Sequence, residues 1–191
     1  MPDRPTQILE AAARLIARRG VRGLRVEEVS AEAGVSTALI YYHFKGRAGL
    51  LRRTLEFINR RAVRYTDAAL DASDAPLSQL TEMLLLEFQD VPQVRENSAA
   101  WGELRATAVF DPDLRELLAG ATREWTDDLA DLIRRAQAAG TAAPGADPQA
   151  AAERLSALVE GLSERWLSGT TTLERAHELV RGAVQAELGP A

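Results

Sequence analysis

The residues best suited to chemistry in this chain of 191 residues gather in one short segment, 36–47. Its tyrosine hydroxyls, imidazole, ammonium and guanidinium groups can donate hydrogen bonds to phosphate oxygens. A threonine and two apolar residues precede them and can contact base edges or a thymine methyl group. The segment therefore indicates a DNA-binding site. The candidate residues are Ser36, Thr37, Ala38, Leu39, Tyr41, Tyr42, His43, Lys45 and Arg47.

Two short helices with a tight turn between them are expected to position these side chains. Gly34 suits the turn because it adopts positive φ without a steric cost, and Ser36 can cap the helix that follows. A short helix that presents a polar and aromatic face across a tight turn suits a DNA major groove. The apolar residues expected beneath that face are Val26, Val29, Ala33, Val35, Ile40 and Phe44.

This segment resembles the DNA-binding region of TetR-family transcriptional regulators. The resemblance implies that Thr37, Ala38 and Leu39 meet base edges. It also implies that Tyr41, Tyr42, His43 and Arg47 contact the DNA backbone, with Lys45 as a further candidate. The matching residues are Ala33-Gly34-Val35-Ser36, Ile40-Tyr41-Tyr42-His43-Phe44, Arg47 and Leu50.

The segment also departs from the family pattern. Arg25 stands where the family has a threonine that caps the second helix, which predicts a weaker or shifted cap. Ser30 replaces a common alanine, Arg47 replaces a lysine, and Ala48 replaces an acid. None of these changes removes a group that DNA binding needs.

The net charge of −5 conceals two regions of opposite sign. Residues 1–64 contain 13 Lys and Arg against 6 Asp and Glu, whereas residues 65–191 contain 10 against 22. A basic head is the electrostatic footprint of a phosphate-binding surface. The alternative is that these arginines only solvate helix faces.

The chain is expected to be helical throughout, with roughly nine helices. Helix-start signals such as Asp111-Pro112 and Asp147-Pro148 mark several boundaries. The expected helices cover residues 6–19, 26–33, 37–43, 47–71, 77–89, 93–108, 112–139 and 148–167, and a last helix starts at Thr171 or Thr172 and ends at 188. Thr6 is the expected N-cap of the first of them. We therefore expect an all-α protein with a helix-turn-helix DNA-binding domain at 1–50 and a helical ligand-binding and dimerisation domain at 51–191.

Catalytic and metal-binding patterns are absent from the sequence. There is no cysteine, and the two histidines, His43 and His177, lie far apart, which argues against a zinc site. The segment around Ser163 lacks the second glycine of a hydrolase elbow, and no phosphate-binding glycine loop is present. We expect neither an enzyme nor a cofactor. The sequence has no signal-peptide layout and no membrane-length apolar run, so cytoplasm is the expected location.

The last two expected helices each present an apolar stripe, and these stripes predict a homodimer that pairs as a four-helix bundle. Burial of both stripes within one chain is the alternative. The resemblance favours a dimer, because TetR-family regulators place two heads on one palindromic operator. The candidate interface residues are Leu155, Leu158, Val159, Leu162, Trp166, Leu173, Ala176, His177, Val180 and Val184.

The middle of the chain contains the candidate effector site. Aromatic and apolar residues could line a cavity between helices there, although aromatic residues at helical spacing are more often ordinary core. The candidates are Met83, Phe88, Trp101, Leu104, Arg105, Phe110 and Trp125. A small-molecule effector follows from the family resemblance, which extends over residues 100–188 to BetI-type regulators.

These features together predict a regulator that binds double-stranded palindromic operator DNA and is released by a small molecule. Repression rather than activation follows from the family alone. The alternatives are a ligand-binding or protein-interaction helical protein without operator binding, and a helical enzyme.

Overall fold

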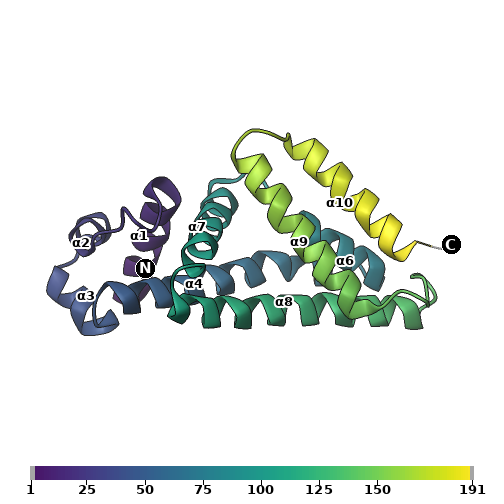
Figure 1. Ribbon diagram of the computed structural model, residues 1–191, viewed down its shortest axis with the longest axis horizontal. Helices are drawn as coiled ribbons and strands as arrows, with labels where there is room; N and C mark the ends of the chain where they lie inside the picture. The colour runs from purple at the N-terminus through teal and green to yellow at the C-terminus, as the bar shows by residue number, and fades with distance from the viewer. Residues whose placement is uncertain (1–2, 190–191) are drawn as a thin grey trace. The chain divides into compact units, whose positions relative to one another are not determined.

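The computed structural model describes residues 3–189, apart from the side chains of residues 71 and 72. Within this range the chain is all-α and forms ten helices (Figure 1). They are α1 (Arg4–Arg19), α2 (Val26–Ala33), α3 (Thr37–Phe44), α4 (Arg47–Thr66), α5 (Ala68–Ala72), α6 (Pro76–Leu85), α7 (Pro92–Ala108), α8 (Pro112–Ala138), α9 (Pro148–Leu167) and α10 (Leu173–Leu188). None of the described helices is both long and apolar enough to cross a membrane.

The helices build two compact units, each described by itself. The first contains the chain up to Arg61 together with Glu96–Gly120, and the second contains Ala62–Arg95 together with the chain from Ala121 onward. The unit boundaries fall inside α4, α7 and α8. The first unit is therefore discontinuous in sequence. The functional division expected near residue 50 stays a prediction.

The helix termini follow the local sequence signals closely. The side chains of Asp147 and Thr172 accept from backbone amides in the first turns of α9 and α10, as expected from the sequence. The expectation of Thr6 as the first cap is wrong, because Asp3 caps α1 and its carboxylate accepts from the Thr6 amide at 2.9 Å. Hydrogen bonds from the Thr6 side chain and, second, from the Thr6 amide hold the pKa of Asp3 below its usual value.

The fourth helix is shorter than expected. It ends at Thr66 rather than at residue 71, and the single-turn helix α5 follows after Asp67. The Thr66 hydroxyl donates to the carbonyls of Ala62 and Val63 at this end of α4. The break accounts for the tenth helix.

Apolar residues from both parts of the first unit form one core. Ile16, Val29, Ile40 and Phe44 belong to it, as expected for the anchoring side of the DNA-binding head. Ala33 and Val35 pack against it while partly exposed. The α7 and α8 segments complete this core with Ala100, Leu104, Ala108 and Leu114.

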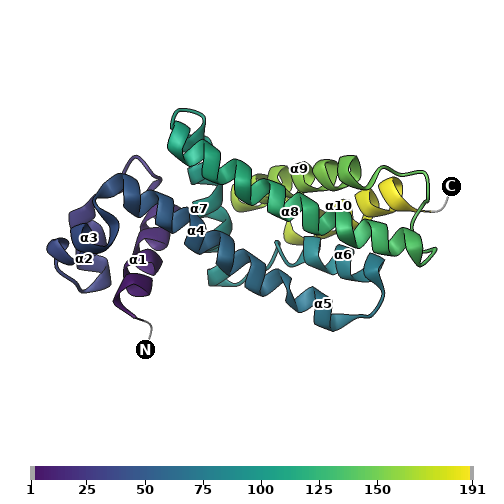
Figure 2. The same ribbon diagram turned by 90° about the horizontal axis from the view of Figure 1, so that it is seen from below.

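The second unit has its own core, in which α9 and α10 lie side by side (Figures 1 and 2). Apolar residues from α6 and α8 contribute to the same core. The rings of Phe88 and Trp166 approach edge-on with centroids 6.2 Å apart. The guanidinium of Arg95 lies over the Trp166 ring at 4.9 Å and covers that face of the indole.

Candidate DNA-binding face and effector region

A tight turn between α2 and α3 sets the direction of the candidate recognition helix. Gly34 ends α2 in the left-handed conformation, with φ of 64°, which only glycine adopts without strain. Ser36 then caps α3, because its hydroxyl accepts from the Leu39 amide at 3.3 Å. The turn expected from the sequence is therefore present with both of its expected roles.

The α3 helix divides its residues between core and solvent. Ile40 and Phe44 are buried, whereas Tyr41 is 52% and Tyr42 is 70% exposed. Core packing is thereby excluded for both tyrosines. The His43 ring is also exposed and meets the Tyr42 ring edge-on at 5.0 Å.

The start of α3 is less exposed than its middle. Ala38 is exposed, whereas Thr37 and Leu39 are half-buried. Leu39 packs in part against the first unit's core, so it has a structural contact as well as a free edge. Its contact with DNA stays a prediction.

The turn after α3 contains two basic side chains with different surroundings. Lys45 is exposed in a left-handed conformation, with φ of 60°, and its ammonium lies 5.8 Å from the centre of the Tyr42 ring. Arg47 is also exposed, but its Nε donates to the Leu24 carbonyl at 3.1 Å and its Nη2 donates to the Val21 carbonyl at 2.6 Å. Arg47 thus ties the α1–α2 loop to the start of α4.

Ion pairs between arginines of α1 and glutamates of α2 hold these two helices together. Arg14 and Arg18 both pair with Glu32, at 3.0 and 2.8 Å, and Arg19 pairs with Glu28 at 2.9 Å. These pairs lower the pKa of Glu32, first through the hydrogen bond from Arg14. Much of the head's positive charge is therefore neutralised within the head.

The seven residues expected to line an effector cavity do not gather within one unit. Met83, Phe88 and Trp125 belong to the second unit, and the other four belong to the first. Leu104 is fully buried in the first core, whereas Phe110 is 79% exposed. The pattern of aromatic residues in the sequence therefore did not identify a set of residues that line one cavity.

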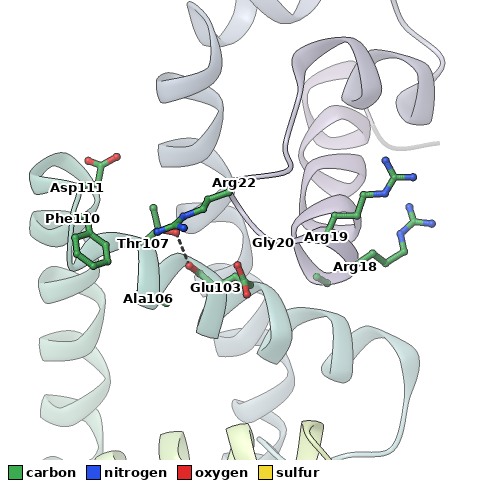
Figure 3. A pocket seen from close by; sticks show the side chains of 10 residues that line it. Arg18, Arg19, Gly20, Arg22, Glu103, Ala106, Thr107, Phe110 and Asp111 are labelled. Atoms are coloured by element: carbon green, nitrogen blue, oxygen red, sulfur yellow. Dashed lines mark hydrogen bonds between the residues drawn. The ribbon is translucent and has the colours of Figure 1, made fainter.

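Phe110 instead lines an open pocket of about 810 Å³ within the first unit (Figure 3). Arg22 extends across this pocket toward Thr107, whereas Arg18 and Arg19 point away from it. Glu103 forms part of the wall, and its carboxylate accepts from the Val21 amide at 3.2 Å. The pocket thus mixes basic, acidic and aromatic groups.

The second unit contains an acidic site that the sequence analysis missed. Glu87 follows α6 and accepts a hydrogen bond from the Tyr65 hydroxyl at 3.2 Å. Glu87 is half-buried as a whole residue, yet loss of water around its carboxylate raises its pKa to about 7, and the nearby charge of Glu160 adds to that rise. The only signal in the sequence is an acid inside the apolar run 84–88.

The apolar stripes expected at a dimer interface lie largely in the second unit's own core. Leu158, Leu173 and His177 are half-buried, and the remaining seven are buried. The His177 Nε2 lies 2.9 Å from the Phe88 carbonyl oxygen, so this histidine is packed within its own chain. The buried seven are Leu155, Val159, Leu162, Trp166, Ala176, Val180 and Val184.

Two known protein families match this chain, one over its basic N-terminal part and the other over its acidic C-terminal part. Residues 8–54 match the bacterial regulatory proteins of the tetR family. Residues 76–189 match the C-terminal domain of BetI-type transcriptional repressors.

Individual relatives agree with these matches. The HTH-type transcriptional regulator BetI of Brucella suis biovar 1 (strain 1330) is 30% identical over 117 residues, which are 61% of this chain and 59% of that protein. The chain thus spans about three fifths of the length of that curated relative.

Two crystal structures are similar over nearly the whole chain. A TetR-family transcriptional regulator from Rhodococcus sp. is 47% identical with a TM-score of 0.91, over 98% of this chain and 100% of that one. A transcriptional regulator from Saccharomonospora viridis in complex with choline is 27% identical with a TM-score of 0.86, over 96% of each chain. With its helix-turn-helix head and its BetI-type C-terminal domain, the chain belongs to the tetR family of bacterial regulatory proteins.

Proposed function

We propose that this protein represses transcription by binding a palindromic operator through α3. The observation that carries the proposal is the division of α3, with Ile40 and Phe44 anchored in the core while Tyr41, Tyr42 and His43 remain exposed. Such a face can place its first residues on base edges and its tyrosines on phosphates. Membership of the tetR family supports this role.

We further propose that two copies pair through the solvent-facing sides of α9 and α10. On α9 this side contains the exposed Ala157 and Gly161, and on α10 it contains the exposed Gly182. Nothing lies within 4 Å of a Cβ built on either glycine, so another helix could approach closely. A two-fold pair would present two α3 helices to the two half-sites of a palindrome.

The effector is proposed to be a small organic cation that binds in the second unit. Glu87 and Glu160 lie close enough for their charges to interact, and a cation between them would relieve that repulsion. The Tyr65 hydroxyl already orients the Glu87 carboxylate. The choline complex of the Saccharomonospora viridis regulator supports a cationic ligand of this class.

Effector binding is proposed to change DNA affinity by a shift between two conformations of the dimer. Helices α4, α7 and α8 each begin in one unit and end in the other, so they can transmit a rearrangement. A ligand shifts such an equilibrium only by its preference for one state, and strong release requires a preference of about 5 kcal/mol. Cation binding would favour the conformation of the dimer in which the two DNA-binding heads do not fit adjacent grooves of the operator.

A direct test uses fluorescence anisotropy with the intergenic DNA upstream of this protein's own gene. We expect salt-dependent binding to an inverted repeat, no comparable binding to a scrambled repeat, and release by choline. Glu87→Gln should keep DNA binding but require at least tenfold more choline for release, because its amide cannot neutralise a cation.

The exposed Glu82→Gln is the matched control and should behave as the unmodified protein. Equal binding to scrambled DNA, or no binding at low salt, would favour the alternative of a helical ligand-binding protein without an operator. Release by choline that is unchanged in Glu87→Gln would contradict the effector site only.

A further inference from the structure

One face of α4 contains both a group of the proposed effector site and a buried cation. Tyr65, whose hydroxyl donates to Glu87 at 3.2 Å, stands four residues after Arg61 in this helix. Residues four apart lie about one turn from each other on the same side of a helix. Arg61 is the residue at which α4 leaves the first unit, whereas Tyr65 belongs to the second. A displacement of Tyr65 is therefore passed along α4 to Arg61.

The ion pair of Arg61 differs in its surroundings from ion pairs on the protein surface. Its Nη1 lies 3.0 Å from the Glu96 carboxylate, its guanidinium lies 5.5 Å from the centre of the Phe57 ring, and its side chain is only 7% exposed. The arginine of the Arg53–Glu56 pair, also on α4, is 54% exposed. A buried ion pair often stabilises a fold no better than apolar side chains of similar volume, because both charges lose their water. The burial of this pair points to a role other than stability.

Three consecutive residues of α7 make contacts outside their own helix. Glu96 forms the buried ion pair, and the buried Asn97 donates from its Nδ2 to the Ile58 carbonyl of α4 at 3.1 Å. Arg95, directly before them, covers the Trp166 ring within the second unit. Two polar contacts thus hold α7 to α4 where both helices pass from one unit to the other.

We propose that the Arg61–Glu96 pair transmits effector binding at Glu87 to the DNA-binding head. This inference rests on the proposed function and adds how its effector site is coupled to DNA. A cation held by Glu87 would alter the hydrogen bond from Tyr65, and α4 would pass the resulting shift to Arg61. A buried guanidinium is stable only where it keeps its partners, so the pair limits α4 to distinct positions on α7. Because α4 begins directly after the turn that ends α3, each position is passed on to the recognition helix.

The test replaces the pair by apolar side chains in the double variant Arg61→Met/Glu96→Met of the full chain. Fluorescence anisotropy gives the operator Kd with and without saturating choline, and calorimetry gives choline binding to the free protein. We expect the choline-induced rise in operator Kd to shrink roughly tenfold or more, which is the size of a typical allosteric coupling. Choline should still bind, because Glu87 and Tyr65 are unchanged. The melting temperature should stay close to that of the unmodified protein, because no charge is left buried without a partner.

Two further variants separate coupling from structure. Arg61→Lys keeps a cation opposite Glu96 and should retain most of the response to choline. The matched control is Arg53→Met/Glu56→Met, which removes an exposed pair from the same helix and should leave the response unchanged.

A response to choline as large in Arg61→Met/Glu96→Met as in the unmodified protein would overturn the proposal, as would an equal loss in the control. If the double variant does not fold, Glu96→Gln removes the charge but keeps an oxygen acceptor for Arg61, and an undiminished response in it would overturn the proposal in the same way. Failure of choline to release the unmodified protein from its operator would instead overturn the proposed function itself.

Discussion

Glu87 is a carboxyl group in surroundings that disfavour its charge. It stands in an apolar run, and loss of water around the carboxylate outweighs the hydrogen bond from Tyr65, so that its pKa rises to about 7. A folded-state pKa above the unfolded value of 4.5 means that the folded protein prefers the protonated form. Ionisation of such a group destabilises the free protein near neutral pH, which agrees with the proposal that Glu87 binds a cation.

Replacement of this carboxyl group should change how stability depends on pH. In the unmodified protein, the contribution of Glu87 is fully present below pH 4.5 and is lost as pH rises through about 7. Glu87→Gln mimics the protonated acid, so its gain in stability over the unmodified protein should be small at pH 5 and reach roughly 1–3 kcal/mol at pH 8. Urea denaturation at both pH values measures this difference.

The exposed Glu82→Gln provides the control for that measurement, because it removes the same charge from a solvated position. A stability gain for Glu87→Gln that is equal at pH 5 and pH 8 would contradict the proposed cost of ionisation. The affinity of the unmodified protein for a cationic effector should increase from pH 6 to pH 8, because the ionised Glu87 carboxylate binds the cation. Over the same range the stability of the free protein should decrease.

At the scale of the element, the junction between α3 and α4 allows little variation. Lys45 and Gly46 both have positive φ, and Gly49 in the first turn of α4 lies against the end of α3. A Cβ at Gly49 would come within 1.9 Å of the Phe44 carbonyl oxygen. Close packing of backbone on backbone thus fixes where the recognition helix stops.

Gly49→Ala should therefore move Phe44 and loosen the recognition helix. We expect a loss of roughly 1–3 kcal/mol in the free energy of unfolding, as for other overpacked sites. Gly120→Ala, inside α8, is the matched control because a Cβ there has no atom within 4 Å. That control should stabilise the protein by up to about 1 kcal/mol, since alanine is the better helix former.

Thermal and urea unfolding of both variants would check this expectation. Equal effects of the two alanines would show that the Phe44 contact does not constrain the junction. Operator affinity should fall in Gly49→Ala and remain unchanged in Gly120→Ala.

At the scale of the whole molecule, the proposed dimer depends on close packing of a second copy against the exposed sides of α9 and α10. Gly161→Glu should prevent pairing, because the two-fold axis would bring two new carboxylates and their bulk into the proposed interface. Light scattering coupled to size exclusion should then report a monomer in place of a dimer. Gly145→Glu, in the loop before α9, should leave the dimer intact.

The discontinuous first unit yields a second expectation at this scale. Leu104, from α7, is fully buried in the same core as Ile40 and Phe44. Leu104→Ala should lower the free energy of unfolding of the first unit by roughly 2–5 kcal/mol. Amide hydrogen exchange in α1–α4 should therefore become faster. The equally buried Leu155→Ala should raise exchange in the second unit instead. The same pattern in both variants would show that the two units unfold as one.

The sequence was sufficient for most of the helices, because their start and stop signals are local. Ser36 and Asp147 predicted the caps that the structure contains, and Arg25 predicted a weaker or shifted cap at α2, where the structure has no side-chain cap. For the last helix the sequence left Thr171 and Thr172 open, and Thr172 is the cap. The end of α4 was not predictable, because no glycine or proline stands between residues 62 and 70 to mark it.

The sites were harder to predict than the helices, because they depend on which residues meet. An apolar stripe such as Leu155 to Trp166 shows that a face is covered, but not whether its own chain or a partner covers it. The DNA-facing residues could be proposed because all of them lie on one short helix and its turn. The acidic site could not, because Tyr65, Glu87 and Glu160 come from three distant segments.

The interleaved first unit also limits how regulators of this kind can be recombined. A chimera that joins only residues 1–50 to a foreign sensor would separate Ile16, Ile40 and Phe44 from the α7 residues that belong to the same core. A successful graft would have to transfer residues 96–120 as well, or supply equivalent apolar residues from the new sensor. Exchange of specificity by replacing only the exposed residues of α3, in contrast, keeps Ile40 and Phe44 and leaves that shared core unchanged.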